Sequence, residues 1–134
     1  MQTFLPLPSF SRSAAVLDRQ RLGKQRIECI QLVRALTLPG AGWANHPAAK
    51  MWAGYVPALA AYGVAVCDAW IARGYRDTCR AQLLPLSDRD GPRPPWFGRP
   101  DFHLAHRSNL VRKAPDHYGP LWPDVAGDLP YVWG

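Results

Sequence analysis

A dense run of charged side chains between Leu17 and Glu28 is the part of this sequence best suited to chemistry. The run holds four cations, three of them arginines, and two carboxylates within a helical pattern. The planar guanidinium of arginine can hold a phosphate group through two hydrogen bonds at once, whereas a solubilising surface is built as easily from lysine. The run therefore predicts an anionic ligand. Charge runs on helices are also common as solvated surface, and that interpretation stays open.

Helical spacing places the two carboxylates of this run among its cations. Asp18, Arg21 and Gln25 share one face, and Arg21, Lys24 and Glu28 share the neighbouring stripe. A carboxylate kept ionised beside phosphate-binding arginines can carry out acid–base chemistry. The same spacing also fits a ladder of surface ion pairs, each worth about 0.5 kcal/mol. The sequence alone does not separate a catalytic cluster from such a ladder.

A second polar segment, near the end of the chain, is also rich in hydrogen-bond donors. Its Ser, Asn, Arg and Lys side chains are the types that usually reach phosphate and sugar oxygens, although a solvent-facing terminal helix is the alternative. His103 and His106 lie three residues apart, but no third ligand has a matching spacing, so we predict no metal site and no cofactor. The candidate nucleic-acid-binding residues of this segment are His106, Arg107, Asn109, Arg112 and Lys113.

The overall composition agrees with an anionic partner. Sixteen Lys and Arg against ten Asp and Glu give a net charge of +6, and nucleic acid is the commonest partner of such a basic chain. Three cysteines without a C-x-x-C pair favour free thiols in a reducing compartment. Neither a secretory signal nor an apolar run that could cross a bilayer is evident, so we expect a cytoplasmic protein. Glycine-loop, Ser-His-Asp and zinc motifs are also absent from the sequence.

Apolar periodicity divides the first part of the chain into helices. A helix capped by Ser9 or Ser11 is expected to reach about Leu22, and the pattern resumes over residues 27–36. Because Gly23 lies between the two stretches, the sequence predicts either two abutting helices or one helix with a weak point.

The apolar pattern in the middle of the chain predicts the main core helix. Asn45 is its expected cap, Pro47 suits its first turn, and its pattern runs to Gly74. Pro57 falls inside this stretch and should kink or split the helix, because proline removes a backbone hydrogen bond and clashes with the preceding turn.

The remaining chain predicts a loop, one more helix and an irregular tail. The loop covers residues 85–100, and the helix covers 102–113, with Asp101 as its cap and Pro115 just after its end. The aromatic, proline-containing tail is expected to pack on the helices. Because no long alternating pattern is present, we predict one compact all-α domain over residues 1–134.

These segments together resemble a known family. The arginine-rich helix ending at Arg26, the sequence Ala72-Arg73-Gly74-Tyr75, and the polar helix followed by Tyr118 are similar to the pyrimidine-dimer DNA glycosylases of phage endonuclease V type, particularly their short bacterial relatives. The resemblance covers most of the chain. It implies an all-α domain that bends duplex DNA, flips a nucleotide and attacks the sugar C1′ with its N-terminal α-amine. The resulting imine then undergoes β-elimination, which cleaves the strand.

The resemblance also implies site residues. The nucleophile would be the α-amine of Met1, because the bulky Gln2 should keep the initiator methionine in place. An α-amine, with a reference pKa of about 8, is substantially neutral at cellular pH and suited to attack. Arg26 matches a site arginine of the family, and the family's catalytic glutamate, three residues before it, falls on Gly23 here.

Asp18 or Glu28 is then expected to stabilise the cationic sugar. Arg21, Lys24 and Lys50 are expected to join the last helix in holding the phosphates of duplex DNA. The predicted function is a DNA glycosylase of the base-excision-repair type with abasic-site lyase activity. Two alternatives remain open at this point: a non-catalytic nucleic-acid-binding protein, and an enzyme that acts on a small nucleoside or phosphorylated substrate.

Overall fold

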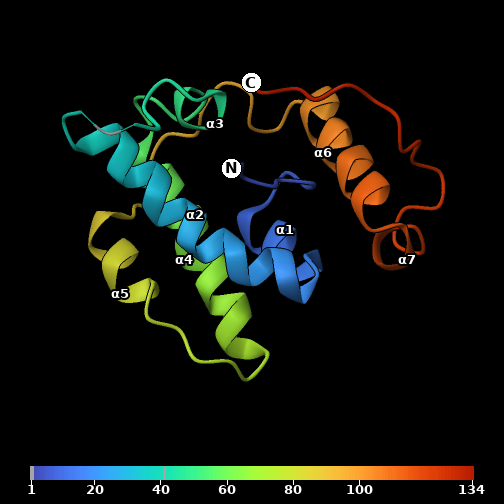
Figure 1. Cartoon of the computed structure of the whole chain (residues 1–134), viewed down its shortest axis with the longest axis horizontal. Coiled ribbons are helices and arrows are strands. Elements are labelled where there is room, and N and C mark those ends of the chain that lie inside the picture. The colour runs from blue at the N-terminus through green and yellow to red at the C-terminus, as the bar shows by residue number, and fades with distance from the viewer. Residues whose placement is uncertain (1, 41) are drawn as a thin grey trace.

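The structure, a computed structural model, describes residues 2–40 and 42–134 (Figure 1). Within these residues it contains helices and connecting segments and no β-strand, which confirms the predicted all-α class. In chain order the helices are α1 (Phe10–Val16), α2 (Arg19–Thr37), α3 (Pro47–Lys50), α4 (Val56–Ala72), α5 (Arg80–Leu83), the 3-10 helix η1 (Leu84–Leu86), α6 (Pro100–Lys113) and α7 (Pro115–Tyr118).

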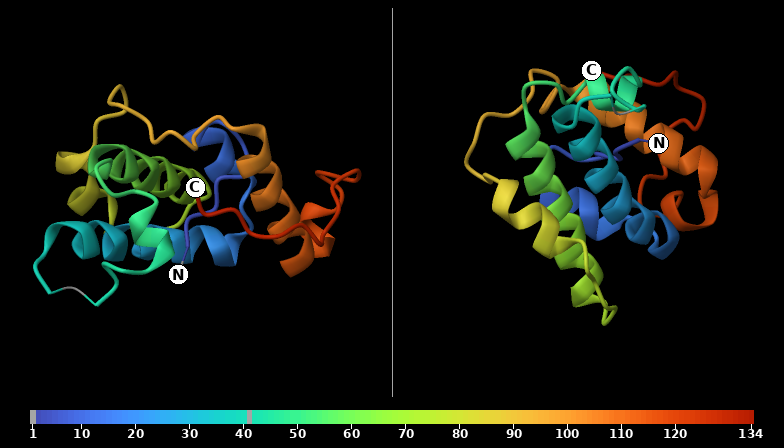
Figure 2. Two further views of the ribbon diagram at one scale, coloured as in Figure 1. Left: turned by 90° about the horizontal axis from the view of Figure 1, so that it is seen from above. Right: turned by 60° about the vertical axis from the view of Figure 1, so that its left-hand side comes forward.

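Helices α2 and α4 form the centre of the fold and lie side by side (Figures 1 and 2). They approach closely at Gly23, where an added Cβ would lie 2.9 Å from the ring of Trp70. Helix α2 continues unbroken through this glycine, so the expected break or weak point does not lie at Gly23. Gly23 is therefore a position of close helix packing. Buried apolar residues of this centre include Leu22, Cys29, Leu32, Leu59, Tyr62 and Val66.

The boundary between the first two helices lies at Asp18. Ser9 caps α1 as predicted, since its hydroxyl accepts the Arg12 N–H at 3.2 Å. Asp18 then leaves the helical conformation and accepts the Arg21 N–H at 3.3 Å, which begins α2. The helix expected to reach Leu22 thus ends earlier, because an aspartate side chain can satisfy the first free N–H groups of the next helix.

Proline splits the predicted core helix into two. Pro47 lies in the first turn of α3 as expected, but the cap is His46 rather than Asn45, and its Nδ1 accepts the Ala48 N–H at 3.0 Å. Pro57 lies in the first turn of α4, where its missing N–H costs no helical hydrogen bond. The chain leaves α4 through Gly74, whose φ of +91° belongs to the left-handed region that glycine tolerates.

The C-terminal third packs around α6. This helix begins at Pro100, so Asp101 lies in its first turn and does not cap it. The tail packs on the helices as predicted: the Trp122 ring stacks on Tyr118 at 5.6 Å, and the Leu129 N–H donates to the Ser108 hydroxyl at 3.0 Å. The short helices α5 and α7 and the 3-10 turn went unpredicted, since one turn of helix is too short to show a period.

The three cysteines are free, as the sequence predicts, and all three are buried. Burial raises the pKa of the Cys29 and Cys67 thiols, so they stay protonated and pack as small apolar groups. Among the described residues, no helix combines the length and the apolar character needed to cross a membrane.

Candidate functional site

The site is built on the first residues of the chain, which run without helix or strand between α2 and α6 (Figure 1). Gln25 of α2, 1% exposed, holds this segment as a neighbouring strand would. Its side-chain NH₂ donates to the Gln2 carbonyl at 2.8 Å, and its side-chain oxygen accepts the Phe4 N–H at 2.8 Å. One buried amide therefore fixes both the position and the direction of the chain start.

Two histidines of α6 hold the next residue of the segment, Leu5. The Leu5 N–H donates to Nδ1 of His106 at 3.0 Å, and Nδ1 of His103 lies 2.7 Å from the Leu5 carbonyl oxygen. Because Nε2 of His103 accepts the Gly98 N–H at 2.9 Å, its proton is on Nδ1, which donates to Leu5. Burial lowers the pKa of both imidazoles, that of His106 to about 3, so both are neutral.

Helices α1 and α4 and a further residue of α6 contribute contacts to the same segment. The Tyr62 hydroxyl of α4 donates to the Phe4 carbonyl, and the Ser13 hydroxyl of α1 bonds both the N–H and the carbonyl of Leu7. Arg107 of α6 donates to the Pro6 carbonyl at 2.8 Å. Side chains far apart in sequence thus replace the partners that a β-sheet would supply.

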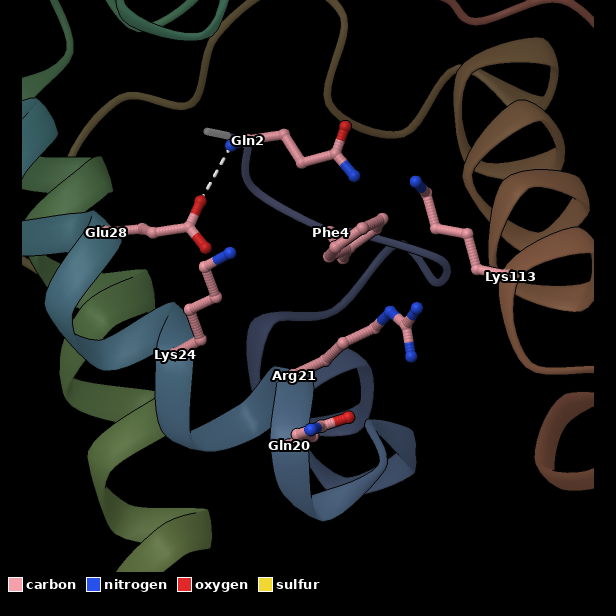
Figure 3. Close-up of a pocket in the computed structure, with 7 residues that line it drawn as sticks. All are labelled: Gln2, Phe4, Gln20, Arg21, Lys24, Glu28 and Lys113. Carbon is pink, nitrogen blue, oxygen red and sulfur yellow. Dashed lines mark hydrogen bonds between the residues drawn. The ribbon is translucent and has the colours of Figure 1, made fainter.

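The start of this segment forms one wall of a cavity of about 530 Å³ (Figure 3). Glu28 of α2, 9% exposed, lies beside the segment, and its Oε2 accepts the Gln2 N–H at 2.8 Å. In Figure 3 the side chains of Arg21 and Lys113 approach the cavity from α2 and α6, while Lys24 reaches toward Glu28. The lining residues are Gln2, Phe4, Gln20, Arg21, Lys24, Glu28 and Lys113.

The charges of this cavity favour an anionic ligand. Three cations and one carboxylate line it. Arg21 shares its charge with Asp18 across 3.3 Å, and its side chain remains 25% exposed. Lys24 and Lys113 are exposed and extend from different helices. Cations that converge from two sides on one buried carboxylate can hold phosphates around a reacting group.

Asp18, the other candidate carboxylate, lies outside the cavity lining. Its carboxylate accepts the Tyr118 hydroxyl, and its own N–H donates to that hydroxyl oxygen at 2.9 Å. Burial alone would raise the pKa of Asp18, but hydrogen bonds from Tyr118 and from the Arg21 N–H outweigh it and hold the pKa below its usual value. Asp18 therefore joins α2 to α7, and Glu28 is the carboxylate in the cavity.

Arg26 is also outside the cavity lining, in a nearly buried cluster between α2 and the segment after α4. Its Nη1 lies 2.7 Å from Asp77 Oδ1, and these side chains are only 13% and 1% exposed. Its guanidinium lies 4.4 Å from the Trp70 ring centroid, and its Nε donates to the Gly23 carbonyl at 3.2 Å. These contacts give Arg26 a packing and ion-pairing role in this structure.

The five predicted nucleic-acid-binding residues of α6 occupy different environments in the structure. Lys113 alone lines the cavity, while Arg107 is bound to Pro6 and Arg112 to the tail carbonyl of Gly127 at 3.0 Å. His106 and Asn109 are both 1% exposed, so neither is presented to a DNA backbone, contrary to expectation. Their polarity serves internal bonds, since the Asn109 amide donates to the Ala105 carbonyl at 2.9 Å.

Two further predicted residues remain, Lys50 and Met1. Lys50 is exposed on α3 and is not among the lining residues. Met1, the expected nucleophile, lies outside the described residues.

Sequence reasoning missed several residues of the site. Gln2, Phe4 and Gln20 line the cavity, and Gln25 holds its wall. The spacing of Gln25 and Glu28, three residues apart on one helix, is the one sequence signal that could have linked Gln25 to the site. Gln2 and Phe4 gave no such signal, because the chain start has no periodic pattern.

Comparison with known proteins identifies the family to which this chain belongs. Residues 1–83 match the family model described as pyrimidine dimer DNA glycosylase. No curated protein and no solved structure matches the chain. The matched residues include α1, α2 and α4, and thus Gln25, Glu28 and the buried chain start. Since 83 of its 134 residues fit the model, the chain belongs to the pyrimidine dimer DNA glycosylase family.

Proposed function

We propose that this protein excises a damaged base from duplex DNA and then cleaves the abasic strand, using its N-terminal α-amine as nucleophile. The observation that carries the proposal is the binding of the Gln2 N–H to Glu28 at the edge of a cation-lined cavity. Three covalent bonds separate the Gln2 nitrogen from the preceding α-amine, so this anchor limits how far the amine can lie from the carboxylate.

The chemistry fits an α-amine, which has a usual pKa of about 8 and is partly neutral near pH 7. The amine nitrogen forms a bond to C1′, and the bond from C1′ to the base breaks, so the base leaves with the electron pair and takes up a proton. Opening of the sugar ring then gives an imine between the enzyme and C1′. Loss of a C2′ proton breaks the C3′–O bond, and the strand is cut by β-elimination.

Glu28 suits the role of the carboxylate in this reaction. It is nearly buried, its Oε2 takes the Gln2 N–H, and Lys24 reaches toward it in Figure 3. We infer that it stabilises the cationic sugar and accepts a proton during elimination. Arg21, Lys24 and Lys113 would hold phosphates on either side of the extruded nucleotide.

Borohydride trapping on an oligonucleotide with one abasic site tests the proposal. Reduction of an imine yields a stable protein–DNA adduct, and peptide mass spectrometry then identifies both the first residue and the modified one. We expect the adduct on the N-terminal amine and no adduct after N-terminal acetylation, which removes the nucleophilic lone pair.

Acetylation removes one positive charge from a chain with a net charge of +6, so DNA binding should largely persist and serves as the control. An adduct on Lys24 or Lys50 would assign the nucleophile to a lysine. Binding without any adduct would support a non-catalytic DNA-binding protein, and neither binding nor adduct would favour a small substrate.

A further inference from the structure

The cavity wall formed by the chain start differs chemically from the walls formed by α2 and α6. It presents the neutral amide of Gln2 and the apolar ring of Phe4, whereas the two helices supply the three cations of the cavity (Figure 3). Cations are the strongest partners of phosphate groups. An amide beside an aromatic ring matches a nucleobase instead, because a base has a polar edge and two flat faces.

Alternation along the chain start places Gln2 and Phe4 on the same side. Both line the cavity. Thr3, which lies between them, is 1% exposed and faces the core, where its hydroxyl accepts the indole N–H of Trp52 at 3.0 Å. Side chains that alternate between two sides are typical of an extended chain. The bond from Trp52 therefore helps to keep the Gln2 and Phe4 side chains at the cavity.

The backbone of Gln2 is fixed on both sides of its α-carbon. Its N–H donates to Glu28 Oε2, and its carbonyl accepts the Gln25 amide, both at 2.8 Å. In Figure 3 the Gln2 side chain extends from this anchor away from Glu28, toward the α6 side of the cavity. Gln2 directly follows the residue that carries the α-amine, so the nucleophile and this amide belong to adjacent residues.

A glutamine amide matches the edge of a pyrimidine base. Its NH₂ group donates and its oxygen accepts, while O2 and N3–H of thymine place an acceptor beside a donor. Linkage of two pyrimidines through C5 and C6 leaves both groups free. When the bond from N1 to C1′ breaks, its electron pair passes to the base, and O2 takes up much of the negative charge. A hydrogen bond to O2 therefore becomes stronger as the base leaves.

We propose that Gln2 and Phe4 form the subsite for the damaged pyrimidine. The Gln2 amide binds O2 and N3–H and stabilises the leaving base, the Phe4 ring supplies an apolar surface, and the base then takes a proton from water. This inference rests on the proposed function. It assigns the chain start a second role beside that of carrying the nucleophile.

Gln2→Leu tests the subsite on two substrates, a duplex with one thymine dimer and a duplex with one abasic site. Leucine is similar in size to glutamine, so the initiator methionine should stay, and mass spectrometry checks the first residue. Single-turnover cleavage of the glycosidic bond, counted as strand breaks after hot alkali, should fall about 10- to 100-fold, as for loss of a hydrogen bond to a charged group. Strand cleavage at the abasic site should keep the wild-type rate, because no base leaves from that substrate.

Gln31→Leu is the matched control, since Gln31 is exposed on the same helix as Glu28 and does not line the cavity. It should retain both wild-type rates. A loss of equal size on both substrates in Gln2→Leu would overturn the proposal, because Gln2 would then act on the amine or on Glu28 and not on the base. Wild-type rates on both substrates would overturn it as well.

Failure of the proposed function gives different patterns. A wild type that cleaves the glycosidic bond without forming a trapped imine overturns the amine mechanism, while the rates of Gln2→Leu and Gln31→Leu on the dimer duplex still decide the role of Gln2. A wild type that cuts the abasic strand but leaves the dimer duplex intact overturns the base subsite and retains the lyase activity. A wild type without either activity overturns both proposals.

Discussion

Arg26 and Glu28 are two residues apart on α2, and their charges serve different parts of the molecule. Residues at this separation do not share a helix face. Arg26 accordingly meets Asp77 and Trp70 on the side toward α4, whereas Glu28 meets Gln2 at the cavity. The resemblance points to Arg26 of α2, whereas the side-chain contacts show that Glu28 of the same helix is the residue next to the chain start.

Glu28→Gln should abolish most of the strand cleavage and leave DNA binding intact. The amide keeps an oxygen that can accept the Gln2 N–H, but it cannot stabilise a cation or accept a proton, so a loss of about 10²- to 10⁴-fold is expected. Binding should not weaken, because one negative charge leaves a cavity lined by three cations. Single-turnover cleavage and a binding titration on the same abasic duplex measure both effects.

Asp18→Asn is the comparison for this prediction, since it neutralises the other candidate carboxylate and keeps a good helix cap. Cleavage should largely survive, because Asp18 lies against Tyr118 outside the cavity lining. Equal losses in the two variants would show that Glu28 has no special part in the reaction.

Arg26→Ala should act mainly on stability. It leaves the Asp77 carboxylate, 1% exposed, without its cation, and a broken buried pair typically costs about 3 kcal/mol. Urea unfolding measures the loss, and adding Asp77→Ala should restore part of it, since no unpaired buried charge remains. A variant that keeps wild-type stability but loses cleavage would instead place Arg26 in the reaction, as its family match implies.

At the scale of elements, α6 holds the chain start through neutral histidines, and this makes the fold sensitive to acid. His106 has a folded pKa of about 3 against about 6.5 for an unperturbed imidazole, and burial lowers the pKa of His103 as well. Between these values the unfolded chain binds more protons than the folded one, so stability falls as the pH falls. Protonated His106 could no longer accept the Leu5 N–H.

We therefore expect the free energy of unfolding to drop between pH 6.5 and 4.5 by up to about 1.4 kcal/mol per pH unit for His106, with His103 adding to the drop in the same direction. Urea unfolding at several pH values measures the slope. His106→Gln, which retains an acceptor for Leu5, should reduce the slope. His117→Gln, at an exposed histidine of α7, is the control and should not. A wild-type slope that persists in His106→Gln would contradict the assignment.

Periodicity and capping chemistry predicted the elements that depend on local sequence. Ser9 as a cap, Pro57 as a point of division and the helix after residue 100 followed from such signals. The continuity of α2 through Gly23 depends on Trp70, 47 positions away, and no local rule contains that contact. The chain start is harder still, because residues 2–7 show no period and are held by side chains of α1, α2, α4 and α6.

At the scale of the whole molecule, the position of the cavity between α2 and α6 decides how the positive charge is used. Several of the 16 Lys and Arg side chains are engaged within the fold: Arg26 binds Asp77, Arg107 binds the Pro6 carbonyl, and Arg112 binds the Gly127 carbonyl. Lys24 and Lys113 are the lysines that line the cavity. The sequence revealed the excess of positive charge. It did not show which cations bind within the fold and which line the cavity, because that depends on tertiary contacts.

The salt dependence of DNA binding tests this division of charge. Each phosphate contact adds about 0.9 to the slope of log affinity against log salt concentration. Lys24→Ala with Lys113→Ala should therefore lower the wild-type slope by about two and weaken binding similarly for all duplex sequences. Arg89→Ala, an exposed cation in the loop before α6, is the control and should leave the slope unchanged.

Lys50→Ala extends the same measurement to α3. An unchanged slope would confine the duplex to the cavity between α2 and α6, whereas a decrease of about one would mean that the DNA also reaches α3, as the sequence predicts for Lys50. A double variant of Lys24 and Lys113 with the wild-type slope would contradict a phosphate-binding cavity altogether, because the loss of two bound phosphates cannot leave counterion release unchanged.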